Sequence, residues 1–278
     1  MSLENSSTKT PNIPMIWMFR GSFFLNHFKS YFYIFFGKSN LVRLALRMRL
    51  KDKRRLKSND YNLKNLHESL EVIRNKSLEE YPHYDYGAGY NYQSLEELNL
   101  CGFRSTEKRI SALKLNERLM GKRVLDIGSN MGSILFSVRD SIKSGLGIEI
   151  NKFLVEQSEI ISSYLKCSEK LDFLSISFEN LNNYQDPFDI ILSLANHSTF
   201  DGNTKQSLDS YFRKINELLV DGGELIFESH PPEIEPPDSL EKTSEVIKKY
   251  FSVTKIDVQG LNGFLDKNRS YFICKKKI

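Results

Sequence analysis

The sequence holds only three cysteines in 278 residues, Cys101, Cys167 and Cys274, and they lie far apart. Their spacing matches neither a disulfide framework nor the paired Cys and His ligands of a zinc site. We therefore predict free, partly buried thiols in a reducing compartment, and no bound metal.

The chain also lacks an uninterrupted apolar run of the roughly 20 residues that a membrane-spanning helix needs. The richest candidate, residues 15–36, holds ten aromatic side chains but also Lys29 near its centre. A cleaved signal peptide fits no better, because the basic residues follow this segment and no small-residue cleavage site is present. We expect a cytoplasmic protein whose residues 1–14 form a flexible tail.

Acidic residues are scarce in the N-terminal part. Residues 1–60 hold twelve Lys and Arg against three Asp and Glu, whereas the remainder holds 27 against 32. Segment 41–57 spaces its basic residues as a helix would, with apolar residues between them. Three partners fit the aromatic and basic extension over residues 15–57: an anionic membrane surface at the inner face, the catalytic domain or a second subunit, and a nucleic acid. No RNA-binding signature accompanies the charge.

Two further patterns precede residue 104. Apolar residues recur at helical spacing over 61–80, which predicts an amphipathic helix. Residues 81–103 then gather five tyrosines around two glycines. A lid over the substrate and a tyrosine-rich surface packed on the domain both fit, and the association of loops with function favours the lid. Ser105 or Thr106 can cap the helix that follows.

The most informative stretch is RVLDIGSNMGS, residues 123–133. An apolar strand carries Asp126 near its end, and Gly128 and Gly132 follow in a loop that leads to an apolar helix. The next strand, GLGIEI, carries Glu149 near its end. This order of strand, glycine loop, helix and strand forms a βαβ unit with parallel strands. An acid in the place of Glu149 suits the two hydroxyl groups of a ribose, so we expect a nucleoside-bearing ligand.

Two classes of ligand are excluded by what the loop lacks. A P-loop needs GxxxxGK[ST], but Gly128 and Gly132 are too close together and no lysine follows. A dinucleotide site needs GxGxxG, but Asn130 and Met131 occupy the middle positions. Asp126 would repel a pyrophosphate but attracts a cationic amine. S-adenosylmethionine carries such an amine together with a ribose.

VLDIGSNMG, with GIEI downstream, resembles motif I and the following acidic strand end of the class I S-adenosylmethionine-dependent methyltransferases. The resemblance covers about residues 104–278. It implies an α/β domain with a Rossmann-like, doubly wound, mostly parallel seven-stranded sheet and an antiparallel C-terminal strand. The usual middle glycine of the motif is Asn130 here, and Asn is the residue that, after glycine, best tolerates the left-handed conformation.

The same resemblance implies S-adenosylmethionine as the cofactor. Ser177 and Phe178 end the expected third strand, LDFLSISF, where the family often offers a polar group and an apolar neighbour to adenine. Arg104 can bind the cofactor carboxylate or an anionic acceptor, and a surface ion pair is the alternative. The complete predicted set is Asp126, Gly128, Ser129, Asn130, Gly132, Glu149, Ser177, Phe178, Leu194 and Arg104.

The remaining periodicity predicts helices over 152–167, 204–219 and 239–250, and a final antiparallel pair of strands, SVTKIDVQG and SYFICKKK. The triplet Asp221-Gly222-Gly223 is expected to stop the second of these helices.

Polar residues follow the fourth and fifth expected strands, at the edge where open α/β sheets bind ligands. The fourth strand delivers Asn196 and His197, and the fifth, ELIFESH, delivers Glu228 and His230. Methyl transfer to a hydroxyl requires alignment of the acceptor and removal of its proton, and histidine is a suitable base. We predict His197 as the base or acceptor orienter beside Asn196, with His230 and Glu228 as second candidates. Capping of loops by the histidines is the alternative.

The sequence thus predicts O-methylation of a small-molecule or glycan-type acceptor. N-methylation, methylation of RNA guided by the basic extension, and a non-catalytic scaffold that binds S-adenosylmethionine are the alternatives. The oligomeric state is left open.

Overall fold

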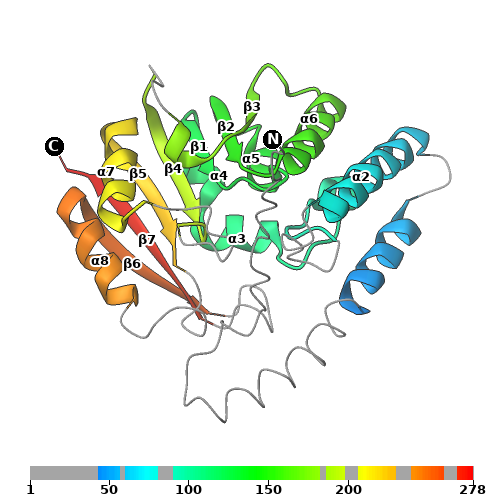
Figure 1. Ribbon diagram of the computed structural model, residues 1–278. Coiled ribbons are helices and arrows are strands. Elements are labelled where there is room, and N and C mark those ends of the chain that lie inside the picture. Colours follow the sequence, from blue (N-terminus) through cyan, green and yellow to red (C-terminus); the bar gives the residue numbers. More distant parts are fainter. Residues whose placement is uncertain are drawn as a thin grey trace, which may run out of the picture.

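Seven strands form one sheet in the computed structural model, which describes residues 43–56, 60–80, 90–181, 186–197, 206–229, 239–259 and 268–277. The strands are β1 (Arg123–Ile127), β2 (Ser144–Glu149), β3 (Leu171–Ser175), β4 (Phe188–Leu194), β5 (Leu219–Glu228), β6 (Phe251–Gln259) and β7 (Asn268–Lys276). Their order is β3-β2-β1-β4-β5-β7-β6, as Figure 1 shows. The first five run parallel, and β7 runs antiparallel to both β5 and β6. The Rossmann-like, mostly parallel seven-stranded sheet implied by the resemblance is confirmed.

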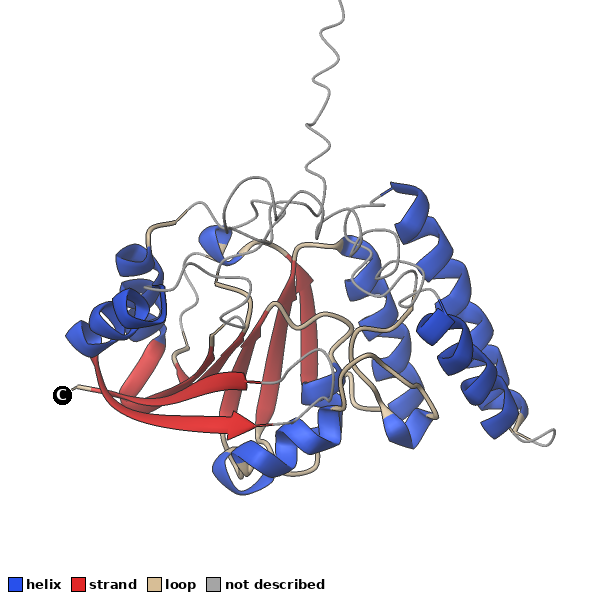
Figure 2. Ribbon diagram, turned by 90° about the horizontal axis from the view of Figure 1, so that it is seen from below, coloured by secondary structure: helices blue, strands red, loops and turns tan. Residues whose placement is uncertain are grey.

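Helices cover both faces of this sheet (Figure 2). They are α2 (Tyr61–Glu80), α3 (Thr106–Leu113), α4 (Leu115–Arg118), α5 (Ser133–Val138), α6 (Lys152–Leu165), α7 (Leu208–Leu218) and α8 (Ser239–Tyr250), with short 3-10 turns η3 (Glu96–Leu98) and η4 (Phe178–Asn180). A further helix spans 43–55. Two apolar clusters fill the layers, one beneath α7 and α8, the other beneath α2, α3, α5 and α6. Side chains along β1 point alternately to the two faces of the sheet and so contribute to both clusters. Val124 packs into the second cluster, while Leu125 and Ile127 pack into the first.

The predicted helical extension is present in the described residues 43–55 and 61–80, and α2 packs along α6 (Figure 1). Its apolar stripe of Leu63, Leu66, Leu70 and Ile73 is buried, which confirms the periodicity. Because the cluster beneath α2 extends to the sheet, one continuous core crosses residue 104.

The described part of the tyrosine-rich segment packs on the domain. Tyr90 lies beneath the guanidinium of Arg74, and Tyr92 lies beneath that of Arg104, each 4.8 Å from ring centroid to Cζ. Residues 90–103 also contribute buried leucines to the core. The packing alternative therefore holds for residues 90–103, and a lid stays a prediction for residues 81–89, which lie outside the described residues.

Two predicted boundaries are wrong. The third strand ends at Ser175, and Phe178 opens η4, because the Ile176 amide bonds to Leu174 O in a tight turn. The triplet 221–223 does not stop α7, which ends at Leu218 and continues directly into β5. The triplet instead lies within β5, where the pairing with β4 shifts register.

Several predicted caps and helices are confirmed. Ser105 caps α3 by accepting a hydrogen bond from Lys108 N, and α8 covers the predicted range 239–250. Within the described ranges, no helix is long and apolar enough to cross a membrane. The predicted tail over residues 1–14 and the aromatic segment 15–36 lie outside these ranges.

Candidate functional site

The glycine loop between β1 and α5 has a left-handed backbone at three positions: φ is 69° at Gly128, 54° at Asn130 and 80° at Gly132. The amides of Gly128 and Ser129 donate to Ile148 O at 2.8 and 3.0 Å, which ties the loop to β2. A Cβ on Gly132 would lie 2.6 Å from the ring of Phe173, so only glycine fits there. Asn130 takes the left-handed conformation that the sequence predicts for it.

Glu149 lies at one side of this loop, at the end of β2. Its two carboxylate oxygens accept hydrogen bonds of 3.1 Å from the amides of Asn130 and Asn151. These bonds fix the carboxylate at the loop, in the place that a ribose-binding acid requires. Contact with a ribose stays a prediction.

Asn196 lies at the other side of the loop, past the end of β4. The backbone turns at Ala195, which has a φ of 58°, and brings the Asn196 side chain across Gly128. A Cβ on Gly128 would lie 2.8 Å from Asn196 Nδ2. Asn196 Oδ1 accepts hydrogen bonds from Ser193 Oγ at 2.8 Å and from Tyr211 Oη at 3.2 Å. Nδ2 is buried and has no hydrogen-bond partner among the described residues.

His197 follows directly and is 5% exposed. Its ring meets that of Phe227 edge to face, with centroids 4.8 Å apart. The structure therefore brings Asn196 and His197 to the same sheet edge as the glycine loop. The second predicted histidine, His230, lies outside the described residues.

Glu228, at the end of β5, is fully buried between two arginines. Arg109 Nη2 lies 3.1 Å from Oε2, and Arg104 Nη1 lies 3.7 Å from Oε1. Burial alone would lower the pKa of Arg109, but Glu228 raises it above its ordinary value. Tyr271 on β7 joins this cluster, and its pKa is raised by burial and by Glu228. The alternative of a surface ion pair for Arg104 is wrong, because this arginine is only 7% exposed.

Asp126 on β1 belongs to the same cluster of charges. It is 3% exposed, and burial raises its pKa to about 7. Arg109 opposes this rise and Glu149 adds to it. Near neutral pH, a cation placed beside Asp126 would drive its carboxyl to ionise.

The other predicted cofactor residues are distributed around this edge. Phe178 is buried and packs against Tyr211, with ring centroids 5.0 Å apart, while Ser177 precedes it half-buried. Leu194 is half-buried at the end of β4. Ser129 is buried, and its Oγ would lie 2.8 Å from a Cβ on Gly147.

Sequence reasoning missed three members of the site: Arg109, Tyr211 and Tyr271. Arg109 is separated from Glu228 by 119 positions, and no local pattern links the two. Tyr211 lies on the buried stripe of α7, where an aromatic residue is typical of a core. A hydroxyl on that stripe, opposite a strand-end Ser193, is the only signal that the sequence offers for it.

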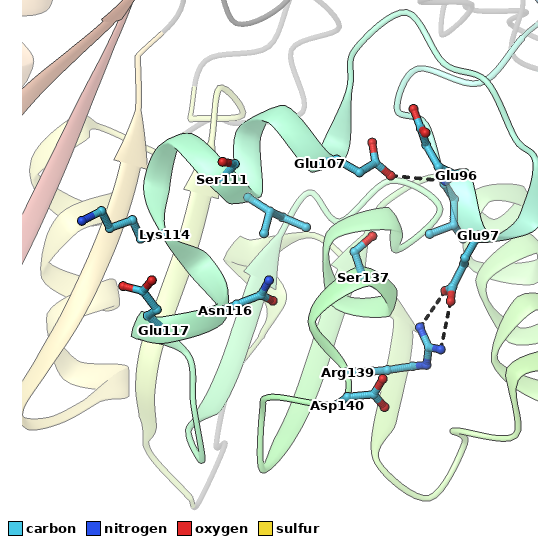
Figure 3. A pocket seen from close by; sticks show the side chains of 12 residues that line it. Glu96, Glu97, Glu107, Ser111, Lys114, Asn116, Glu117, Ser137, Arg139 and Asp140 are labelled. Atoms are coloured by element: carbon cyan, nitrogen blue, oxygen red, sulfur yellow. Dashed lines mark hydrogen bonds and ion pairs between the residues drawn. The ribbon is translucent and has the colours of Figure 1, made fainter.

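A separate open hollow lies between α3, α4 and the C-terminal end of α5 (Figure 3). Its lining residues are Leu95, Glu96, Glu97, Glu107, Ile110, Ser111, Lys114, Asn116, Glu117, Ser137, Arg139 and Asp140. Arg139 holds Glu97 through two contacts of 2.6 and 2.9 Å at one side. None of the predicted site residues lines this hollow. Across the described part of the chain, no group of three or more His, Cys, Asp or Glu is placed to hold a metal.

The residues at the glycine loop fit S-adenosylmethionine. The carboxylate of Glu149 and the Nδ2 of Asn196 lie on opposite sides of a loop in which Gly128 and Gly132 have no room for a side chain. The buried Nδ2 of Asn196 is placed to donate to an acceptor on a ligand, and Asp126 supplies a charge suited to an amine.

The sequence matches the family model described as a methyltransferase domain over residues 119–275, more than half of the chain. No curated protein matches the sequence. The fold is similar to that of a class I S-adenosylmethionine-dependent methyltransferase from Listeria monocytogenes, described as putative (TM-score 0.51, 16% identity, 75% of this chain and 69% of that one).

The fold is also similar to that of the MccD protein (TM-score 0.50, 13% identity, 62% of this chain and 97% of that one). A similarity with a TM-score of 0.49 is found to the N-methyltransferase NodS from Bradyrhizobium japonicum WM9 in complex with S-adenosyl-L-homocysteine (13% identity, 62% of this chain and 87% of that one). The family match, the seven-stranded sheet and the glycine loop agree. The chain belongs to the methyltransferase-domain family and is a class I S-adenosylmethionine-dependent methyltransferase.

Proposed function

We propose that the protein transfers the methyl group of S-adenosylmethionine to an oxygen of a small-molecule or glycan-type acceptor. The observation that carries this proposal is the position of Asn196 and His197 after the end of β4, with the side chain of Asn196 beside Gly128. When bound, the cofactor supplies an activated methyl group on a sulfonium leaving group. The protein then has to align an acceptor and remove its proton.

In this proposal His197 holds or removes the acceptor proton. Its burial against Phe227 restricts the ring to one place at the sheet edge. The sequence suggests Glu228 as a second candidate for the base, but we assign it a structural role. Its charge is neutralised by Arg104 and Arg109, so it organises the buried cluster instead of acting as a base. His230 is the second candidate for the base.

The cofactor is held by the glycine loop and the strand ends. Glu149 binds the ribose, Asp126 attracts the amine, and the small residues of the loop let the ligand approach the backbone. Ser177 and Phe178 face the adenine, and Leu194 and Arg104 complete the set.

The test is isotope transfer. Cell extract is incubated with the protein and a donor that carries a labelled methyl group, and the products are separated by mass spectrometry. Label in a small molecule or glycan at a methoxy carbon supports the proposal. Label in RNA supports the alternative acceptor, and cofactor binding without transfer supports the scaffold alternative.

We also propose an anionic membrane surface as the partner of the helix over 43–55. One face of this helix is anchored to the domain by Asp52, which is 1% exposed and accepts a 2.9 Å hydrogen bond from Cys101 N. A contact between Tyr90 Oη and Asp52 Oδ2 adds to the anchor. The basic residues Arg43, Arg47, Lys51, Lys53 and Arg54 are all exposed on the rest of the helix.

Apolar side chains share that exposed surface. Leu46 and Leu50 are 52% and 53% exposed, and Leu44 is 41% exposed. Cations interleaved with exposed leucines suit a helix that lies on anionic headgroups, because the leucines enter the interface while the cations bind phosphates.

Flotation with vesicles tests this second proposal. Protein that floats with phosphatidylglycerol vesicles but not with phosphatidylcholine vesicles supports it, provided that Leu46→Ser/Leu50→Ser reduces flotation. The matched control is Val72→Ser, since Val72 is an apolar residue of similar exposure, 55%, on another helix, α2. Salt-dependent RNA binding that requires residues 43–55, without flotation, favours the nucleic-acid partner.

A further inference from the structure

We propose that Asn196 is a dedicated hydrogen-bond donor to the carboxylate at the amino-acid end of the cofactor, and that Ser193 and Tyr211 are the positioning residues that fix it in this role. The inference rests on the proposed function, because it takes S-adenosylmethionine as the ligand of the glycine loop. It assigns to the amide a task on the cofactor side of the reaction.

In the structure the oxygen of the Asn196 amide faces two hydroxyl groups. Ser193 Oγ and Tyr211 Oη lie 2.8 and 3.2 Å from Asn196 Oδ1 and 2.8 Å from each other, so their two protons are shared among the three oxygens and at least one hydroxyl donates to Oδ1. Tyr211 is 2% exposed, and burial raises the pKa of its phenol, which keeps the proton available for donation. An amide whose oxygen is engaged by two hydroxyl groups has only N–H groups left to offer a ligand.

The free side of the amide points at the glycine loop. Nδ2 lies 2.8 Å from the position of the Cβ that Gly128 lacks, and the Asn196 Cβ lies 3.0 Å from it. Among the described residues Nδ2 has no partner, although it is buried. A buried amide that lacks a partner is destabilising, so such a group is retained where a ligand satisfies it.

The chemistry of the cofactor selects the atom that Nδ2 binds. The amino group of the cofactor is a donor and cannot accept from an amide N–H, and the ribose end is served by Glu149 on the opposite side of the loop. The carboxylate is the only anionic acceptor in S-adenosylmethionine, and hydrogen bonds to charged acceptors are the stronger kind.

The test compares two ligands by calorimetry. S-adenosylhomocysteine carries the amino-acid end, whereas methylthioadenosine has the same adenosine and a thioether but lacks that end. Asn196→Asp replaces the N–H groups by an anionic oxygen at almost equal size. We expect it to weaken S-adenosylhomocysteine binding by about 100-fold and to leave methylthioadenosine binding within about twofold. Tyr211→Phe removes one of the two hydroxyl groups that hold Oδ1, so a loss of about three- to tenfold, again confined to S-adenosylhomocysteine, is expected.

The matched control is Tyr250→Phe, which removes a hydroxyl that donates to Asp209 Oδ2 at 3.0 Å on the outer helices. It should change neither affinity. Methylthioadenosine binding reports whether the adenosine part of the site is folded, so in each variant it serves as the reference for the affinity for S-adenosylhomocysteine. Equal losses for both ligands, or an unchanged affinity for S-adenosylhomocysteine in Asn196→Asp, would overturn the inference while leaving methyl transfer intact. Failure of the wild-type protein to bind either ligand would overturn the proposed function as well.

Discussion

Arg109 on α3 lies 3.1 Å from the carboxylate of Glu228 at the end of β5, and both side chains are at most 2% exposed. This ion pair joins the helix that precedes the sheet to the strand that ends beside the site. The positive charge of the Arg109 guanidinium also acts on Asp126 and lowers the pKa of its carboxyl, against the rise caused by burial. The arginine therefore compensates carboxylates from two neighbouring parts of the sheet edge.

Replacement of Arg109 by Met is expected to destabilise the protein by about 3–5 kcal/mol, because Glu228 would remain buried without its main cation. Denaturant unfolding measures this loss. Arg118→Met is the control, since its pair with Glu224 is 3.9 Å long and about a third exposed, and it should cost less than about 1 kcal/mol. A double variant, Arg109→Met with Glu228→Gln, should recover part of the loss. An Arg109→Met protein as stable as the control would contradict the role given to this pair.

Cofactor affinity is expected to rise with pH through about 7, the pKa to which burial raises Asp126. Below that pH the folded protein holds the carboxyl protonated, and the amine of the ligand favours the ionised form, so binding should release a proton. Arg109 and Glu149 are the charged groups that act on Asp126. Calorimetry in two buffers of different ionisation enthalpy measures the released proton.

Asp126→Asn should abolish this proton release, whereas Asp172→Asn, at an exposed position on β3, should preserve it.

The raised pKa of Asp126 also makes the stability of the folded protein depend on pH. An acid whose pKa is raised on folding favours the folded state at low pH, and this contribution is lost as pH rises from about 4 to about 7. Unfolding of Asp126→Asn should therefore be less dependent on pH over this interval than unfolding of the wild-type protein.

Gly128→Ala is expected to abolish tight cofactor binding for a steric reason. The added methyl would meet Asn196 Nδ2 at 2.8 Å, in a backbone with a φ of 69°. Gly121→Ala isolates the cost of the backbone alone, because Gly121 has a φ of 68° and nothing within 4 Å of its Cβ position. Gly121→Ala should lose about 1 kcal/mol of stability and Gly128→Ala at least as much, but only Gly128→Ala should lose affinity in calorimetry. Equal affinities in the two variants would remove Gly128 from the cofactor site.

His197→Ala is expected to reduce turnover by about 100-fold or more, with cofactor affinity retained, if the imidazole handles the acceptor proton. The matched control is His67→Ala, a histidine on α2 whose Nε2 lies 2.7 Å from Leu98 O and which is not among the predicted site residues. Single-turnover transfer from labelled cofactor to the identified acceptor measures the effect. A twofold loss would leave His197 without a chemical role and would turn attention to His230.

The sequence predicts those parts of the fold that local physics determines. Alternation in β1, the left-handed Asn130 and the Ser105 cap each depend on a few neighbouring residues, and all are present in the structure. The prediction that the triplet 221–223 ends a helix is wrong, because its glycines also permit a strand with a shifted register. Only the pairing with β4 decides between a helix stop and a strand.

The site was predictable only in outline. Strand ends point to Asn196 and Glu228, because parallel strands share one carboxyl edge. The orientation of the Asn196 amide depends on Tyr211 from a helix, and the charge of Glu228 depends on Arg109 from another. Such contacts arise from tertiary packing, and no short-range pattern in the sequence encodes them.

The packing of α2 on α6 has a consequence for biosynthesis. The leucines of α2 leave the ribosome first, and their partner helix begins only at Lys152. Until α6 emerges, the growing polypeptide presents an apolar stripe that only a chaperone or a transient collapse can shield. Slow translation between the two helices would prolong this vulnerable interval, and aggregation of stalled chains would follow from the order in which the pieces are made.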